Sequence, residues 1–506
     1  MNFVIIMLIV LTFVSRIMGL GREIALAYFY GISDISDAYL MSIAIPTIIV
    51  TFVIVSLATS YVPAYQNLEE DAVTKKAFTN KVMGLTCTIC LLILVVSYFF
   101  MPQIAPLFVS GFDAPTMALT VVLTRITIFA VFFMGMNQIL QSFMQVKEKV
   151  LLASLSGLPF NIIAILFIVV SVHTSVEMLA IGTVIALGIQ CLYLLILAHR
   201  QGFKLKPQFD LKDATIRNLI VLTLPIILSN TALQIGIMID KNLASRFGAG
   251  AISALAYATR TTTAISGIFV TSILVVTFPK IAKQSAVGDM PQLKDSLAES
   301  IVGMGLFIIP VIAAVLLFAQ PVITLLFGRG AFDTEAILLT SSLLFFYIFF
   351  LFGDGMTQLL SRVFFSLGDS KTPMIVSVVT VVINVVLNFV FIALIGIIGL
   401  ALATSVSAMI GLALLFVLLR RKIGSLRLRD TVISLNKIVG ASVLMAYGAY
   451  FVYQYLEDFN ATLALLVAAV FGIGIYGVLL VFLRIREVNN LLAIAISKIR
   501  NRWKKT

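Results

Sequence analysis

Long hydrophobic runs without charged residues recur along almost the whole chain. A helix needs about 20 apolar residues to cross the hydrocarbon layer of a bilayer. The run at 372–419 contains no charged residue and is long enough for two such helices, which we expect to be joined by a turn at 395–399. Hydrophobic residues make up 61% of the chain and charged residues 11%, whereas soluble proteins have about 45–50% and 25%. We therefore predict an all-α polytopic membrane protein.

The same criterion predicts 14 transmembrane helices. Besides the pair in 372–419, three segments are hydrophobic but carry a few charges: 1–30, 36–66 and 114–146. The first lacks a small-residue cleavage site, so we expect a retained span and not a signal peptide. The remaining spans come from the runs 82–112, 150–176, 178–198, 218–239, 261–279, 300–328, 336–353, 438–456 and 459–483.

The basic residues sort to one side of this arrangement. Of the 35 Lys and Arg residues, 28 fall in alternate connections or after the last span, and only Arg246 and Arg329 fall in the opposite connections. Cytoplasmic loops of membrane proteins carry the excess of Lys and Arg. We therefore expect both termini in the cytoplasm, and we read the net charge of +12 as topology and not as a sign of a nucleic-acid partner. The segment 486–506 is predicted to be a basic amphipathic tail that lies on anionic lipid.

An internal repeat relates the two halves of the chain. A shift of 217 residues lays 22–27 over 239–244, Tyr30-Gly31 over Phe247-Gly248, and Ser36 over Ser253. Because each copy holds six spans, both copies share one orientation, as in two-lobed transporters whose lobes are related by an axis along the membrane normal. We predict two pseudo-symmetric six-helix lobes, an N-lobe at 1–205 and a C-lobe at 206–425, followed by a separate C-terminal helix pair at 426–485.

A few charged residues lie inside the predicted spans. Those that we consider for a substrate site are Arg16, Arg22, Glu23, Asp37 and Arg260; the others are Arg125, Asp240 and Lys241. A charge at the bilayer centre costs about 2.5–3.5 kcal/mol on insertion scales, so such residues usually face an aqueous cavity and are functional. Ion pairs that hold helices together are the alternative, above all for Glu23 and Asp37. The surplus of arginine indicates an anionic guest, because guanidinium groups bind phosphate oxygens in bidentate fashion.

Four polar residues in later spans have oxygen atoms that suit a small cation. They are Asp240, Asn384, Asn388 and Thr404. Ordinary interhelical hydrogen bonding is the alternative explanation, and it is the one we favour. The chain has only two histidines, so a histidine-based metal site is not expected.

Several motifs resemble those of the MurJ family, the bacterial lipid II flippases of the multidrug/oligosaccharidyl-lipid/polysaccharide exporter superfamily. The resemblance runs from residue 12 to about residue 410. The first motif and the LFGRGAF loop separate this family from the rest of the superfamily. The motifs are SRIMGLGRE at 15–23, SDAY at 36–39, YATR at 257–260, LFGRGAF at 326–332, SRVFF at 361–365 and DSKTP at 369–373.

The resemblance implies a cationic central cavity between the lobes and a hydrophobic groove for a lipid tail at 426–485. It assigns substrate binding to Arg16, Arg22, Glu23, Asp37 and Arg260. In some family members a sodium ion lies between the spans that here carry Asp240, Asn384, Asn388 and Thr404. Many members also have basic residues where this chain has Val50-Thr51, which implies a less positive cavity here.

These inferences predict a lipid II flippase of the bacterial plasma membrane. It would move the undecaprenyl-diphosphate-linked peptidoglycan precursor from the inner to the outer leaflet by alternating access, driven in part by the membrane potential. Its partners would be lipid II, membrane lipids and the cell-wall synthesis machinery, with no cofactor except a sodium ion. The alternatives are an exporter of another undecaprenyl-linked oligosaccharide and a drug antiporter. An enzyme is not expected, because the only acidic cluster, 69–71, lies in a loop.

Overall fold

The computed structural model describes residues 3–68, 71–206, 208–210, 212–425 and 429–485. Throughout these residues the regular structure is helical, which confirms the all-α prediction. Twelve helical segments are long and apolar enough to cross a membrane, or thirteen with the pair Ala114–Thr127 and Ala130–Val146, which is bent by 49°. That count leaves out Phe3–Tyr30, whose first side chains lie outside the described residues. The chain is a multi-span membrane protein.

The chain forms two compact units. Unit 1 contains the residues up to Tyr257 together with Phe327–Ala336, and unit 2 contains Ala258–Leu326 and the residues from Ile337 onward. The predicted lobes at 1–205 and 206–425 and the separate pair at 426–485 remain predictions. The tail predicted at 486–506 lies outside the described residues.

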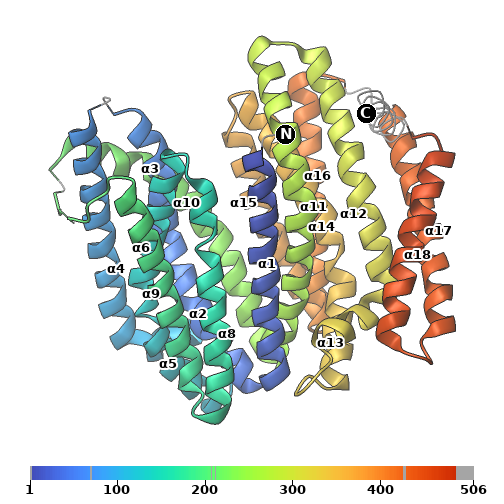
Figure 1. Cartoon of the computed structure of the whole chain (residues 1–506), viewed down its shortest axis with the longest axis horizontal. Coiled ribbons are helices and arrows are strands. Elements are labelled where there is room, and N and C mark those ends of the chain that lie inside the picture. The colour runs from blue at the N-terminus through green and yellow to red at the C-terminus, as the bar shows by residue number, and fades with distance from the viewer. Residues whose placement is uncertain (1–2, 69–70, 207, 211, 426–428, 486–506) are drawn as a thin grey trace, which may run out of the picture. The chain divides into compact units, whose positions relative to one another are not determined.

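Unit 1 is built from a continuous series of helices (Figure 1). Its core gathers Tyr61, Met83, Phe143 and Phe203, all nearly or fully buried. The helices are α1 (Phe3–Tyr30), α2 (Asp34–Val50), the π-helix η1 (Thr51–Val55), α3 (Ser56–Gln66), α4 (Ala72–Phe108), α5 (Ala114–Thr127), α6 (Ala130–Val146), α7 (Val150–Ser154), α8 (Gly157–His173), α9 (Glu177–Arg200), α10 (Ala214–Ala244), the 3₁₀-helix η2 (Ser245–Phe247) and the start of α11 (Ala251–Val287).

Unit 2 holds the rest of α11 and the later helices. They are α12 (Met290–Phe327), α13 (Thr334–Tyr347), α14 (Phe349–Ser366), α15 (Lys371–Ile395), α16 (Ile398–Ile423), α17 (Arg429–Leu456) and α18 (Ala461–Phe482). The run at 372–419 forms α15 and α16, and Gly396 turns the chain between them with a φ of 65°, so the predicted turn is confirmed. The pair α17 and α18 packs on α12 through Phe318, Ala449 and Ala468.

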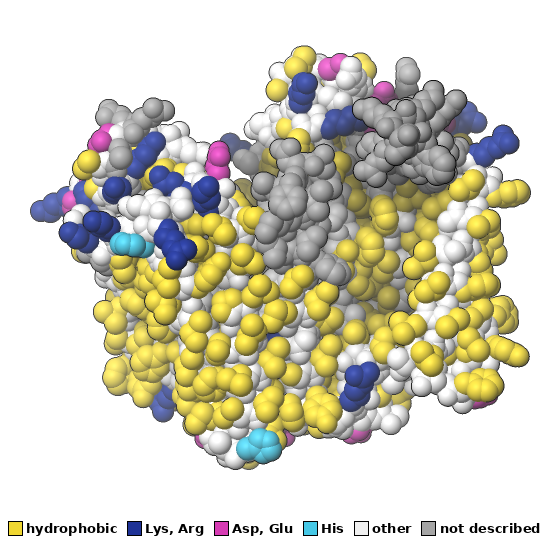
Figure 2. All heavy atoms as spheres, viewed as in Figure 1, with side chains coloured by type: hydrophobic (Ala, Val, Ile, Leu, Met, Phe, Trp, Pro, Cys, Tyr) yellow, Lys and Arg dark blue, Asp and Glu magenta, His cyan; other side chains and the backbone are white. Residues whose placement is uncertain are grey.

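Basic side chains gather at one end of unit 1. Lys75, Lys76, Lys147 and Gln201 line one cavity of about 420 Å³, so three connections with predicted positive charge lie at the same end. On the visible face of unit 1, Lys and Arg side chains cluster at that end and hydrophobic side chains cover the flanks of the helices (Figure 2). This distribution agrees with the predicted sorting of charge within unit 1.

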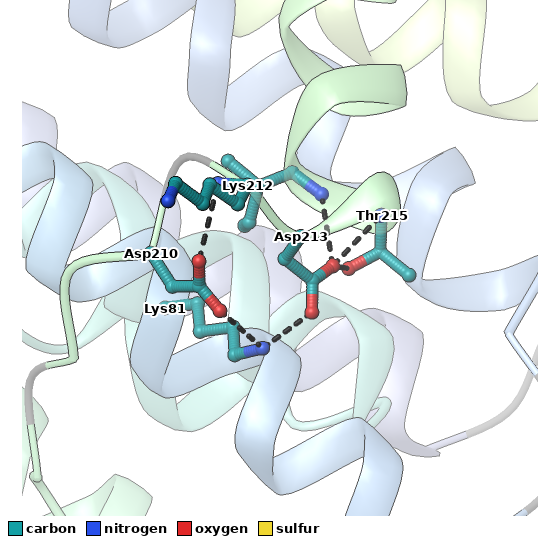
Figure 3. Close-up of polar contacts among 6 residues, drawn as sticks. Lys81, Asp210, Lys212, Asp213 and Thr215 are labelled. Atoms are coloured by element: carbon teal, nitrogen blue, oxygen red, sulfur yellow. Dashed lines mark hydrogen bonds and ion pairs between the residues drawn. The ribbon is translucent and has the colours of Figure 1, made fainter.

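The connection between α9 and α10 is fixed to α4 by polar contacts (Figure 3). Lys81 Nζ donates a hydrogen bond to Asp210 Oδ2 at 3.2 Å and another to Asp213. The N–H of Lys206 donates to Asn80 Oδ1 at 2.9 Å. The hydrogen bond from Lys81 is the main reason that the pKa of Asp213 lies below its usual range. The start of α10 is therefore held against unit 1.

Candidate functional site

The charged pair Arg22–Glu23 lies in the C-terminal third of α1. Arg22 Nη2 is 2.7 Å from Glu23 Oε1, and the two side chains are 20% and 6% exposed. The Arg22 guanidinium also lies over the ring of Phe160 in α8, 5.3 Å from its centroid. The five N–H donors of arginine exceed what one carboxylate oxygen accepts. Arg22 thus keeps hydrogen-bonding capacity for a ligand.

Asp37 caps the start of α11. Its Oδ2 accepts from the Gly250 N–H at 2.9 Å, and its Oδ1 accepts from the Ser253 N–H at 2.7 Å and from the Ser253 hydroxyl. The carboxylate is fully buried. The first N–H groups of a helix have no partner within the helix, and a carboxylate there is stabilised by the helix dipole. The geometry therefore joins α2 to α11, and the predicted role of Asp37 in substrate binding remains a prediction.

Two residues that the repeat aligns are in direct contact. Ser36 Oγ and Ser253 Oγ, which are 217 residues apart, lie 2.8 Å from each other. A residue and its repeat mate meet where they lie close to the axis that relates the copies. The pseudo-symmetric lobes that the repeat predicts remain a prediction.

The LFGRGAF motif folds back onto unit 1. The Ala331 N–H donates to the Tyr28 carbonyl at 2.8 Å, at the end of α1. Tyr257, from the YATR motif, packs its ring against Phe327 at 5.0 Å and Phe332 at 5.8 Å. Gly330 has a φ of 66°, and a Cβ there would collide with the Tyr28 carbonyl oxygen, so glycine is required. Two motifs that are distant in sequence thus meet at the end of α1.

The structure gives less detail for the two other predicted substrate residues, Arg16 and Arg260. The side chain of Arg16 lies outside the described residues, although the α1 backbone at this position is helical. Arg260 lies in the part of α11 that belongs to unit 2, and its side chain is exposed. Glu23 and Arg260 each make a further interaction. The assignment of all five residues to substrate binding stays a prediction.

Three of the four residues considered for a cation lie together in unit 2. Asn384 Nδ2 is 3.4 Å from Thr404 Oγ1, and Asn388 Nδ2 is 3.4 Å from Asn384 Oδ1. The first contact joins α15 to α16 and the second lies within α15, and the oxygens of these three side chains are all neutral. Asp240, the only carboxylate of the set, belongs to unit 1. Among the described residues, no three His, Cys, Asp or Glu side chains form a group suited to a metal.

Sequence reasoning missed several groups of this region. It did not identify Ser253 and Gly250 as partners of Asp37, although the repeat had already paired Ser253 with Ser36. In unit 2 it also passed over Asp354, a partly buried carboxylate in α14 that accepts from Gln358 Nε2 at 2.8 Å. The i, i+4 spacing of Asp354 and Gln358 was the available signal.

The helical architecture is that of a known class of transporters. A multidrug resistance MATE family transporter of the MOP superfamily, in an inward-facing conformation, matches with a TM-score of 0.67 over 82% of this chain and 96% of that chain, at 16% identity. At this identity the likeness concerns the fold alone. The fold is thus that of a multi-span protein with the architecture of MOP-superfamily transporters.

The chain belongs to the family described as lipid II flippase MurJ, whose family model matches residues 26–471. It is 28% identical over 488 residues to the probable lipid II flippase MurJ of Thermotoga maritima, which covers 95% of this chain and 96% of the relative. It also matches a solved structure of lipid II flippase MurJ in an inward closed conformation, with a TM-score of 0.82, 26% identity and coverage of 95% of this chain and 99% of the other.

Proposed function

We propose that this protein is a lipid II flippase of the bacterial plasma membrane. It moves the undecaprenyl-diphosphate-linked peptidoglycan precursor from the inner to the outer leaflet by alternating access, with both termini in the cytoplasm. Membership of the family and similarity to relatives named lipid II flippase support this substrate. The structural observation that carries the proposal is Arg22, a guanidinium inside an apolar helix that retains donors beyond its bond to Glu23.

In this mechanism the diphosphate binds to arginine. Arg22 offers paired N–H donors to phosphate oxygens, and Arg16 and Arg260 add positive charge when the substrate is bound. Glu23 orients Arg22 in the absence of substrate. The undecaprenyl tail stays in lipid beside α17 and α18, where exposed side chains such as Phe451 and Phe482 are apolar. The positive charges thus bind the anionic diphosphate, which the hydrocarbon layer cannot solvate.

In this proposal Asp37 holds α2 and α11 together through its hydrogen bonds. Its bonds to Gly250 and Ser253 hold the ends of two helices together at a fully buried position. Breaking them would leave a carboxylate and helix N–H groups unsatisfied unless water enters. We propose that these bonds open only when the transporter changes its conformation.

Membrane potential supplies part of the driving force. An inside-negative potential is worth about 2.3 kcal/mol per charge per 100 mV, and it favours outward movement of an anionic headgroup. A sodium ion on Asp240, Asn384, Asn388 and Thr404 is a further proposal, supported by their oxygen atoms alone. The cell-wall synthesis machinery is the proposed partner beyond lipid. No chemical step is required of the protein, which is proposed to be a transporter and not an enzyme.

The decisive test is rescue of cells depleted of their essential lipid II flippase. We expect the chain to restore growth and to prevent accumulation of lipid II in the inner leaflet. Failure to rescue at normal expression would instead favour an exporter of another undecaprenyl-linked oligosaccharide. A drug antiporter is disfavoured because a site for cationic drugs would be acidic, whereas the candidate site residues of this chain have a surplus of arginine.

Variants of the arginines test the site itself. We expect Arg22→Ala and Arg260→Ala to fold normally and to lose rescue, because each removes a phosphate-binding group. Arg217→Ala, an exposed arginine at the start of α10, is the matched control and should rescue. Transport of labelled lipid II by Arg22→Ala at the normal rate would contradict the assignment.

A further inference from the structure

A row of glutamines marks a polar pocket in unit 1 that the proposed diphosphate site does not use. Gln138, Gln141 and Gln145 are spaced by three and four residues, so they lie on one face of α6. Together with Gln190 they line a cavity of about 430 Å³, which we call the carboxamide pocket. The residues that line this pocket include no charged side chain.

The three carboxamides on α6 have no protein partner among the described residues, whereas their neighbours do. Gln190 accepts from Asn137 Nδ2 at 3.3 Å and donates to Ser156 Oγ at 3.2 Å, so it is fixed in place. Each free carboxamide brings two donors and two acceptor lone pairs. Polar groups with no partner are rare on membrane spans unless they face water or a ligand.

The uncharged polar lining of the pocket favours a neutral polar ligand. Phosphate would be bound by Arg or Lys, and a metal ion by carboxylates, but the lining has neither. Carboxamides are complementary to hydroxyl and amide groups, which are the groups that sugars and peptides present. A guest of that class satisfies both the donors and the acceptors of the three free glutamines.

The pocket lies beside the proposed diphosphate site. Gly157 lines the pocket, and a Cβ on it would come within 2.6 Å of Ser15 Oγ in α1. Phe160, whose ring lies under Arg22, is one turn farther along α8. Along α1, Ser15 and Arg22 are separated by about 10 Å of helix rise. A sugar attached directly to a diphosphate at Arg22 is therefore within reach of the carboxamide pocket.

We propose that the carboxamide pocket is a subsite for the neutral sugar and peptide groups of the lipid-linked substrate. This proposal rests on the proposed flippase function. It explains why three glutamines without protein partners occupy one face of a membrane span, next to a site that binds phosphate.

The test compares two ligands on the purified full-length chain. One probe is lipid II, and the other is undecaprenyl diphosphate, which has the diphosphate but neither sugar nor peptide. The variant is the triple substitution Gln138→Met, Gln141→Met and Gln145→Met, because methionine matches glutamine in length and helix propensity but cannot form these hydrogen bonds. The control is Gln208→Met, Gln292→Met and Gln320→Met, which changes three exposed glutamines outside the pocket.

We expect the triple pocket variant to bind lipid II about tenfold more weakly or worse, because several hydrogen bonds are lost. Its affinity for undecaprenyl diphosphate should stay within about twofold, because that probe has no sugar or peptide group to bond to the glutamines. The control should bind both probes as the unchanged chain does. Should the triple variant fail to fold, Gln141→Met alone carries the test with a smaller fall in lipid II affinity.

Three results would overturn the inference. Unchanged binding of lipid II by the pocket variant would show that the glutamines serve only to hydrate the helix. An equal loss for both probes would show an effect on the diphosphate site or on the fold. Absence of lipid II binding by the unchanged, folded chain would reject the proposed function itself, and the inference with it.

Discussion

At the scale of single residues, Asp37 shows how a buried charge is stabilised inside a membrane protein. The helix that it caps begins after Gly248 and Gly250, whose φ angles of 89° and 80° leave no local side chain in the capping position. The cap comes instead from α2, more than 200 residues earlier in the chain. A helix N-terminus and a carboxylate, each unfavourable alone in a buried site, stabilise one another.

Removal of this cap should destabilise the protein. We expect Asp37→Ala to lower the free energy of unfolding by about 1–3 kcal/mol, since it leaves buried N–H groups of α11 without an acceptor. Thermal unfolding in detergent measures the change. Asp34→Ala, an exposed residue one turn earlier in α2, is the control and should have a small effect. Equal unfolding temperatures for the two variants would contradict the capping role.

The sequence identified the charged residues of this region but not their partners. Arg22, Glu23 and Asp37 were recognisable because a charge in an apolar run is costly whatever surrounds it. The bond from Ser253 to Asp37 depends on tertiary packing, and no local pattern encodes it. The repeat came nearest, because it matched Ser36 with Ser253.

At the scale of elements, the turn between α15 and α16 depends on glycine. Gly399 lies so close to Phe391 that a Cβ would collide with the Phe391 backbone, including its carbonyl oxygen at 2.5 Å. Backbone atoms cannot rotate away as a side chain can. The two helices therefore approach at the distance that glycine permits.

We expect Gly399→Ala to destabilise the protein by about 1–3 kcal/mol through overpacking. Gly440→Ala in α17 is the matched control, because a Cβ there meets nothing within 4 Å. That change should be neutral or stabilising by up to about 1 kcal/mol, since alanine favours helix more than glycine does. Unfolding midpoints of the two variants in the same detergent decide the question, and a stabilising Gly399→Ala would refute the close packing.

The connection that Lys81 holds should make stability depend on pH. Because the pKa of Asp213 is lowered in the folded chain, the unfolded chain takes up the proton first as pH falls. The stabilisation is complete above the unfolded pKa of about 3.9 and is lost as pH falls toward the folded value. Lys81 and Asp213 are partly exposed, so the pair contributes about 1 kcal/mol or less.

The measurement is the unfolding temperature at pH 6 and at pH 3. We expect the unchanged chain to lose more stability between these values than Lys81→Met does, because the variant lacks the pair already. Lys212→Met, whose side chain is exposed beside the same connection, should behave as the unchanged chain. Identical pH dependence in all three chains would show that the ion pair contributes nothing.

Uncharged runs predicted the helices well, because the hydrocarbon layer sets their length and composition. The turn at 395–399 was predicted from its two glycines. The breaks between α5 and α6 and between α7 and α8 were not, since both lie in continuous apolar sequence. The π-helix η1, which begins at Thr51 after Pro46, was also unforeseen.

At the scale of the whole molecule, the charge distribution predicts a topology that labelling can test. In a chain whose three cysteines are replaced, we introduce Lys204→Cys or Arg246→Cys, both at exposed positions. An impermeant maleimide added to intact cells should label the cysteine at 246 and not the one at 204. Inside-out vesicles should reverse the pattern, and the opposite result would place the termini outside the cytoplasm.

The compact units and the two halves related by the repeat divide the chain differently. The repeat placed α10 in the second half of the chain, yet α10 belongs to unit 1. Its contacts explain this: Asn230 donates to Ser56 at 2.9 Å, and Asn242 donates to the Leu107 carbonyl at 3.1 Å. Sequence similarity between the two halves reflects their common origin. Membership of a compact unit depends instead on side-chain contacts such as these.

The fold of the 327–336 loop also has a consequence for biosynthesis. The Tyr28 carbonyl is made early, but its partner, the Ala331 N–H, emerges about 300 residues later. At about 5–20 residues per second, the ribosome needs about 15–60 s to supply it. Once residue 257 has been made, unit 1 has the helices up to that residue but still lacks the loop that covers Tyr257. A nascent chain stalled before residue 327 therefore cannot complete unit 1, however long it waits.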